Sequence, residues 1–82
     1  MNITPLRDDL RKVLHKYNLE NKFLKQKRLF ESDSYYPSLH TEKLQPVHLN
    51  IYSFRIDKKY RAIFIVTEKK EVEIIDINMH YQ

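Results

Sequence analysis

The sequence predicts an α+β fold in which an N-terminal helical hairpin packs on one face of a small antiparallel β-sheet, within one domain spanning residues 1–82. Three observations carry this prediction. Residues 4–30 repeat apolar side chains at helical spacing, residues 49–79 contain three strand-like runs, and short loops join those runs. A chain of 82 residues has room for one layer of helices on one sheet, so we expect an active site to be an open groove that suits a polymer.

The first predicted helix begins at Thr4-Pro5, because threonine can cap a helix and proline suits the first helical position. Asp8 and Asp9 follow in the early turns, where negative charge interacts favourably with the helix dipole. The helix is predicted to end at Asn18. Its apolar residues recur at spacings that place them on one face: Leu6, Leu10, Val13, Leu14 and Tyr17.

A second helix is predicted from about Leu19 to Phe30, and the same pattern also fits a single bent helix. Lysine and arginine number 15 against 11 acidic residues, and the net charge of +4 favours a polyanionic partner, either nucleic acid or an acidic peptide. The helical cations are consistent with a solvated face or with a phosphate-binding surface. They are Arg7, Arg11, Lys12, Lys16, Lys22, Lys25, Lys27 and Arg28.

The composition excludes several common kinds of site. The chain has no cysteine and no glycine, which excludes disulfides, thiol chemistry and glycine-rich phosphate loops. The four histidines are not spaced as paired ligands, so we expect no metal and no cofactor. No apolar signal core opens the sequence and no run approaches the ~20 apolar residues of a membrane span, so we expect a cytoplasmic protein without membrane association.

Residues 32–47 have no steady period and contain two of the three prolines, which predicts an ordered loop or a short extended stretch. Three strand-like runs follow, and the short loops between them predict an antiparallel meander. The runs are Leu49–Ile56, Tyr60–Thr67 and Val72–Met79.

The loop lengths predict the register of this sheet. If the first loop has three residues, Ile56 pairs with Tyr60 and Arg55 lies opposite Arg61. If the second loop has an even number of residues, Thr67 pairs with Val72, and Arg61 then pairs with Asn78. One face is then apolar and is expected to carry the helices: Tyr52, Phe54, Ile56, Tyr60, Ala62, Phe64, Val66, Ile75, Ile77 and Met79. The other face collects Ser53, Arg55, Arg61, Asp76, Asn78 and His80, with Ile63, Ile65 and Ile74 toward the far end.

The two facing arginines point to a site on the polar face. Like charges directly opposite each other in an antiparallel pair are destabilising, so Arg55 and Arg61 favour an anion between them. That anion is either Asp76, as a structural partner, or a phosphate group, which guanidinium groups bind through two parallel hydrogen bonds. His80 reads either as a solvated polar residue or as an acid–base group, because the reference pKa of histidine, ~6.5, lies near physiological pH.

Four short motifs follow one another along the chain: Ser38-Leu39-His40-Thr41-Glu42-Lys43-Leu44, Tyr52-Ser53-Phe54-Arg55-Ile56, Tyr60-Arg61-Ala62-Ile63-Phe64 and Met79-His80-Tyr81. In order and spacing they resemble toxins of the RelE/ParE superfamily. The two-helix segment and a very short first strand at Met1–Thr4 also suit that fold, so the resemblance covers nearly the whole chain. The His-Tyr pair, and the glutamate two residues before the loop leucine, are most similar to the RelE/YoeB mRNA interferase branch.

The resemblance implies the toxin of a type II toxin–antitoxin system, a metal-independent endoribonuclease that inhibits translation. Such enzymes cut mRNA, usually on the ribosome, by attack of the ribose 2′-hydroxyl on the adjacent phosphate. The resemblance implies that Glu42 is the general base and His80 the general acid of this reaction. It implies that Arg61, with Arg55, stabilises the phosphate charge and that Tyr81 stacks on or orients the substrate. It assigns RNA binding to Lys43 and Lys58.

Two other functions are compatible with the same fold. A ParE-like poison of DNA gyrase does not need an acid–base pair, so the presence of both Glu42 and His80 argues against it. An inactive or regulatory member would only bind an antitoxin. The expected partners are a cognate antitoxin protein, mRNA and the ribosome, with operator DNA bound only by the toxin–antitoxin complex. Glu42, expected on a loop, also reads as a plain surface carboxylate.

Overall fold

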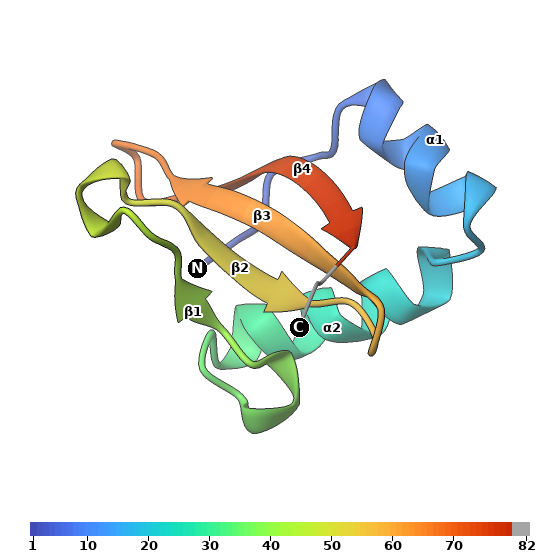
Figure 1. Cartoon of the computed structure of the whole chain (residues 1–82), viewed down its shortest axis with the longest axis horizontal. Coiled ribbons are helices and arrows are strands. Elements are labelled where there is room, and N and C mark those ends of the chain that lie inside the picture. Colours follow the sequence, from blue (N-terminus) through green and yellow to red (C-terminus); the bar gives the residue numbers. More distant parts are fainter. Residues whose placement is uncertain (80–82) are drawn as a thin grey trace.

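The computed structural model describes residues 1–79 of the chain. Two helices precede a four-stranded antiparallel sheet with the strand order β1-β2-β3-β4, which confirms the predicted α+β architecture (Figure 1). Neither helix is long and apolar enough to span a bilayer. The elements are α1 (Asp8–Lys16), α2 (Glu20–Ser32), the 3₁₀ helix η1 (Pro37–Leu39), β1 (Glu42–Lys43), the 3₁₀ helix η2 (Val47–Leu49), β2 (Tyr52–Arg55), β3 (Tyr60–Val66) and β4 (Val72–Met79).

Helix α1 begins at Asp8, and the predicted start at Thr4-Pro5 is wrong. The backbone N–H and the hydroxyl of Thr4 both donate to the Val72 carbonyl, at 2.8 and 3.2 Å. Ile3 forms a parallel bridge with Val72, and this bridge is all that exists of the expected first strand. The segment extends the sheet beside β4, so its backbone is not available to start a helix.

The turn between the two helices is built on Asn18, whose φ is 56°. Its N–H donates to the His15 carbonyl at 3.1 Å, and the N–H of Leu19 donates to the Leu14 carbonyl at 2.8 Å. This is the Schellman pattern, which usually has glycine at the left-handed position. Asparagine tolerates that conformation well, and the chain contains no glycine. The predicted helix end is confirmed, and the segment is a hairpin of two helices.

Aromatic rings attach α2 to one face of the sheet. The ring centroid of Phe30 lies 5.2 Å from those of both Phe54 and Phe64, and Phe23 lies 6.3 Å from Phe54. In the view of Figure 1, α2 crosses behind the sheet, so neither helix covers the face turned to the reader. The buried apolar side chains form one cluster between helices and sheet: Ile3, Leu10, Leu14, Leu19, Phe23, Phe30, Leu39, Phe54, Ile56, Ala62, Phe64, Val72, Ile74 and Ile77.

The β2–β3 hairpin has the predicted register. The N–H of Ile56 donates to the Tyr60 carbonyl at 2.9 Å, and Arg55 pairs with Arg61. The side chain of Asp57 accepts the backbone N–H groups of the third loop residue and of Tyr60, both at 2.8 Å. These bonds hold the three-residue loop that makes the two arginines face each other.

The β3–β4 hairpin has the predicted register at one end only. Arg61 pairs with Asn78 as expected, but at the turn Val72 pairs with Val66, and the predicted pairing with Thr67 is wrong. A register shift between the two ends accounts for the difference of one residue.

This shift changes the faces of two isoleucines. Ile63 pairs with Asp76 and Phe64 with Ile74, which leaves Ile75 without a partner on β3. Ile74 is buried in the core, whereas Ile75 is half-buried. The prediction placed Ile75 on the covered face and Ile74 on the open face, and it is wrong for both because an extra residue inverts the alternation of a strand.

Residues 32–47, predicted as an ordered loop or a short extended stretch, contain the edge strand β1. Glu42, expected on a loop, pairs with Ser53 of β2. Strand β2 begins at Tyr52, later than the expected Leu49, because η2 ends in a left-handed residue, Asn50, with φ of 54°. The edge strand matters for function because it brings Glu42 against the sheet.

Candidate active site

Cross-strand pairing gathers charged and polar side chains at the centre of the open face. Glu42 pairs with Ser53, and Arg55 pairs with Arg61. Residues two apart on one strand point to the same face, so both pairs project on the same side of the sheet. Together with His40 they line a small hollow of about 100 Å³.

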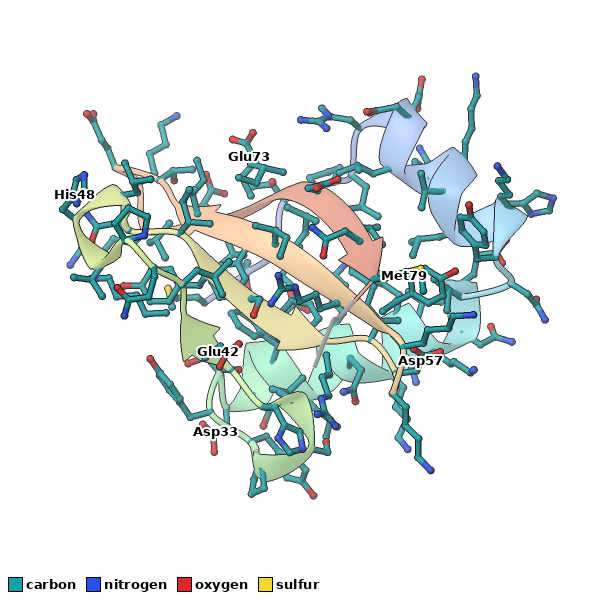
Figure 2. The ribbon with its side chains drawn as sticks, viewed as in Figure 1. Asp33, Glu42, His48, Asp57, Glu73 and Met79 are labelled. Atoms are coloured by element: carbon teal, nitrogen blue, oxygen red, sulfur yellow. The ribbon has the colours of Figure 1, made fainter. Side chains whose placement is uncertain are left out.

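Arg61 makes the central contacts of this hollow. Its Nη1 lies 3.9 Å from Oε1 of Glu42, and its Nε donates to Oδ1 of Asn78 at 3.1 Å. The Arg61 side chain is 24% exposed. The guanidinium is therefore held from two sides while part of its fork of donors remains accessible. Figure 2 shows Glu42 on β1 at one edge of the sheet.

Asp76, the structural counter-ion considered for the two arginines, reaches Arg61 only through Asn78. Nδ2 of Asn78 donates to Oδ2 of Asp76 at 3.2 Å, and Oδ1 of Asp76 accepts the backbone N–H of Ile77 at 2.9 Å. The ion pair that the structure records for Arg61 is with Glu42. Asp76 thus orients an amide beside the arginine, and a phosphate between the arginines stays a prediction.

Two residues that sequence reasoning missed help to shape the hollow. Gln26 of α2 is only 7% exposed, and its Nε2 donates to the carbonyl of Arg55 at 2.8 Å and to that of Ser38 at 3.3 Å. It thereby ties β2 to η1, the segment that leads to Glu42. His40 has φ of 46° and turns the chain from η1 toward β1. A lone glutamine in a cationic helix gave no signal in the sequence, and His40, although part of the first motif, was given no role.

The other candidate residues lie outside this cluster. Lys43 follows Glu42 on β1 and therefore points to the opposite face, where its Nζ lies 5.7 Å from the Tyr52 ring centroid. Lys58 is exposed in the β2–β3 loop, at the arginine end of that hairpin. His80 and Tyr81 lie outside the described residues. The roles of all four remain predictions.

The β2–β3 loop carries a carboxylate, that of Asp57, whose pKa is lowered. Partial burial raises the pKa of Asp57, but the backbone N–H groups of Tyr60 and Lys59 and the Lys22 ammonium at 3.2 Å lower it more, so the net change is downward. Figure 2 shows Asp57 at the tip of this hairpin. Its ionised form is therefore a stabilising part of the loop that sets the Arg55–Arg61 pairing.

The arrangement combines a proton acceptor with cations and buried polar groups. The carboxylate of Glu42 is exposed, whereas Ser53 is 3% exposed at the floor of the hollow. Guanidinium groups on two adjacent strands can stabilise a developing negative charge between them. Among residues 1–79, no group of three or more His, Asp or Glu side chains is placed to hold a metal ion.

Two solved structures share this fold along nearly the whole chain. A YoeB/ParE toxin from Agrobacterium tumefaciens superposes with a TM-score of 0.71 and 19% sequence identity, covering 99% of this chain and 100% of its own. A chain of the heterotetrameric YoeB-YefM toxin-antitoxin complex from Staphylococcus aureus superposes with a TM-score of 0.67 and 18% identity, covering 98% of this chain and 94% of its own.

No protein-family model matches the sequence, and no curated protein matches it either. The chain has the same fold as these YoeB/ParE toxins. The resemblance read from the four sequence motifs is therefore confirmed at the level of the fold.

Proposed function

We propose that this chain is the toxin of a type II toxin–antitoxin system, a metal-independent endoribonuclease of the YoeB kind that cuts mRNA on the ribosome and so inhibits translation. The observation that carries the proposal is the contact of Arg61 with Glu42 across the hollow, beside Arg55. A carboxylate next to a guanidinium combines a proton acceptor with charge stabilisation, and transesterification of a phosphodiester needs both. The shared fold supports the same function.

The size and openness of the hollow favour a polymeric substrate. Its volume of about 100 Å³ lies well below the ~300 Å³ at which pockets for small molecules begin. A single RNA strand lying across the open face would place one phosphodiester between Arg55 and Arg61 and continue over the sheet on both sides. Lys58 at the hairpin tip would then meet a flanking phosphate, whereas Lys43 points to the other face and would not contact this strand.

The proposed reaction is an intramolecular transesterification. Glu42 takes the proton from the ribose 2′-hydroxyl, and the 2′-oxygen forms a bond to the adjacent phosphorus. Arg61, with Arg55, stabilises the additional negative charge on the phosphate. The bond between phosphorus and the 5′-oxygen breaks, and His80 donates a proton to that oxygen while Tyr81 orients the substrate. The products are a 2′,3′-cyclic phosphate and a free 5′-hydroxyl, and no water is consumed.

The helical hairpin supports a second part of the proposal, the antitoxin partner. A groove of about 460 Å³ runs between α1 and α2, and the side chain of Leu24 on its rim is 45% exposed. Its lining combines apolar side chains with two cations and one anion: Pro5, Leu6, Leu14, Phe23, Leu24, Arg11, Lys27 and Glu20. Apolar surface with surrounding positive charge complements an acidic amphipathic segment, which we assign to the antitoxin.

A pair of leucine variants tests this surface. Leu24→Ser should weaken binding of the co-encoded antitoxin, whereas Leu49→Ser, at an exposed leucine in η2, should leave it unchanged. The association rate should also fall as salt increases, because the attraction is electrostatic. Equal affinities for both variants would remove the groove from the proposal.

The function itself is tested by inducing the protein without its antitoxin. The wild type should produce mRNA fragments with 5′-hydroxyl and 2′,3′-cyclic phosphate ends, Arg61→Ala should not, and the matched control Arg28→Ala on α2 should behave as wild type. Gyrase-linked DNA breaks are measured in the same cells. Breaks without RNA ends would identify a gyrase poison, and the absence of both would identify an inactive or regulatory member.

A further inference from the structure

Strand β4 contains one residue, Ile75, that has no counterpart on β3. From the turn, Val72 and Ile74 pair with β3 and point into the core. Ile75 has no partner, and beyond it the core-facing residue is Ile77. Bulges of this kind bend a strand and re-aim its side chains, and they are frequent next to active sites.

The bulge decides which β4 side chains reach Arg61. With an uninterrupted alternation from the turn, Asp76 and Asn78 would point into the core, and Ile77 would point to the open face. With the bulge, Asn78 lies beside Arg61 and accepts its Nε–H at 3.1 Å. A single inserted residue therefore exchanges an apolar neighbour of the arginine for a hydrogen-bonding one.

The bulge itself is held by a contact from the other end of the chain. Nη2 of Arg7 donates to the carbonyl of Ile75 at 3.1 Å. The same guanidinium is fixed by Asp9, whose two carboxylate oxygens accept from its Nε and Nη2 at 3.0 and 3.2 Å. The Arg7–Asp9 pair thus satisfies the carbonyl of the one β4 residue that has no partner on β3.

We propose that Asn78 and Asp76, brought to the open face by the bulge at Ile75, are positioning residues for Arg61. Asp76 accepts from Nδ2 of Asn78 and so fixes the amide with its oxygen toward Nε of Arg61. This bond uses the inner edge of the guanidinium and leaves donors on Nη1 and Nη2 for a phosphate. Because the Asn78 amide is neutral, it orients the arginine without neutralising the charge that a phosphate would meet.

The first test does not depend on activity. The Nε–H resonance of Arg61, identified by its loss in Arg61→Lys, should exchange with water about two- to tenfold faster in Asn78→Ala, as expected for loss of one hydrogen bond. The matched control Asn21→Ala, on the exposed side of α2, should leave it unchanged. An unaltered Arg61 resonance in Asn78→Ala would overturn the proposal.

Asp76 is tested by a conservative rescue. Asp76→Ala removes the acceptor that fixes the Asn78 amide, so Arg61 Nε–H exchange should quicken. Asp76→Asn retains a carbonyl oxygen at the same place and should restore slow exchange. If Asp76→Ala behaves as wild type, or if Asp76→Asn fails to restore it, Asp76 does not position the amide.

The effect on cleavage rests on the proposed function. Asn78→Ala should lower kcat roughly tenfold or more through misplacement of the guanidinium, with KM for RNA nearly unchanged because the positive charge remains. Asn78→Asp should instead raise KM, since a second carboxylate repels the substrate phosphate. If the wild type cuts no RNA, the proposed function fails while the exchange measurements still decide the positioning. If it cuts RNA and Asn78→Ala keeps the wild-type kcat, the positioning role is wrong.

Discussion

The two faces of the sheet use similar positions on the same strands for different purposes. The covered face buries Phe54 and Phe64 against Phe30 of α2, so these side chains contribute to stability. The open face holds Arg55 opposite Arg61, a like-charged pair that is unfavourable for the folded sheet. Keeping this like-charged pair costs some stability, although the neighbouring residue on each strand belongs to the core. Such a cost is expected where a surface serves a function.

The two faces also differ in the partners that their side chains need. Core rings need only volume and contact, and many arrangements of apolar residues provide these. The guanidinium of Arg61 instead needs partners at defined atoms, which it finds in Glu42 and Asn78. Variants of the two faces should therefore separate loss of stability from loss of activity.

The largest effect is expected on the covered face. Phe30 is 1% exposed and contacts two other aromatic rings, so Phe30→Ala should lower the free energy of unfolding by about 3–5 kcal/mol, measured by urea denaturation. Phe30→Leu should cost less because it retains more of the buried volume. The exposed Tyr35 is the matched control, since Tyr35→Ala should be nearly neutral. Similar losses for Phe30→Ala and Tyr35→Ala would mean that the rings do not form the core described above.

On the open face we expect a large loss of activity with little or no loss of stability. Arg61→Ala should lower kcat/KM for RNA by roughly 10²–10³-fold, about 3 kcal/mol of transition-state stabilisation by comparison with lost oxyanion donors. The free energy of unfolding should stay the same or rise, because the repulsion from Arg55 is removed. A variant that loses activity and stability in parallel would assign Arg61 to the structure and not to the chemistry.

Different parts of the two faces were predictable from the sequence. The Arg55–Arg61 pairing follows from the length of one loop, because Asp57 fixes a three-residue connection and alternation does the rest. The resemblance of four motifs to a known superfamily led to the correct fold. The bulge at Ile75 was not predictable, since Ile74 and Ile75 fit the apolar face equally well and only the turn and the contact from Arg7 select between them.

The candidate site was likewise predictable only in part. The sequence placed Arg55, Arg61 and Asn78 on one face correctly. Loop length and alternation decide this for the two arginines, whereas for Asn78 the wrong pairing assumed at the second turn offset the bulge that was not predicted. Periodicity did not place Glu42 beside Arg61, since a two-residue edge strand has no detectable period, and only the resemblance implied that the two belong to one site. Nor did the sequence reveal Gln26, whose role depends on two carbonyl groups that meet only in the folded chain.

A third prediction concerns the two proton-transfer residues of the proposed reaction. His80→Gln should flatten the alkaline limb of the pH–rate profile, and Glu42→Gln the acidic limb, whereas Arg61→Ala should lower the rate at every pH. RNA with a 2′-deoxyribose at the scissile nucleotide should resist cleavage by the wild type and by every variant. If that substrate is cut as fast as RNA, the attack by the 2′-hydroxyl is wrong. If it is uncut and His80→Gln keeps the wild-type profile, only the general acid has been misassigned.

The smallest effect is expected in the loop that joins β2 and β3. Partial burial raises the folded-state pKa of Asp57, but the hydrogen bonds from the Tyr60 and Lys59 amides and the Lys22 ammonium lower it more. The pKa therefore lies below its ordinary value of 3.8. A lowered pKa stabilises the folded protein above the unfolded-state value, and this stabilisation is lost as the pH falls through the folded-state value. Asp57→Asn retains an oxygen for the amide bonds and loses the charge, so it should cost roughly 1 kcal/mol at pH 7. The difference in the free energy of unfolding between wild type and Asp57→Asn should stay constant down to about pH 5 and shrink below 3.8. A difference that persists unchanged in acid would show that the carboxylate charge does not stabilise the loop, and the Arg55–Arg61 register would then depend on the loop backbone alone.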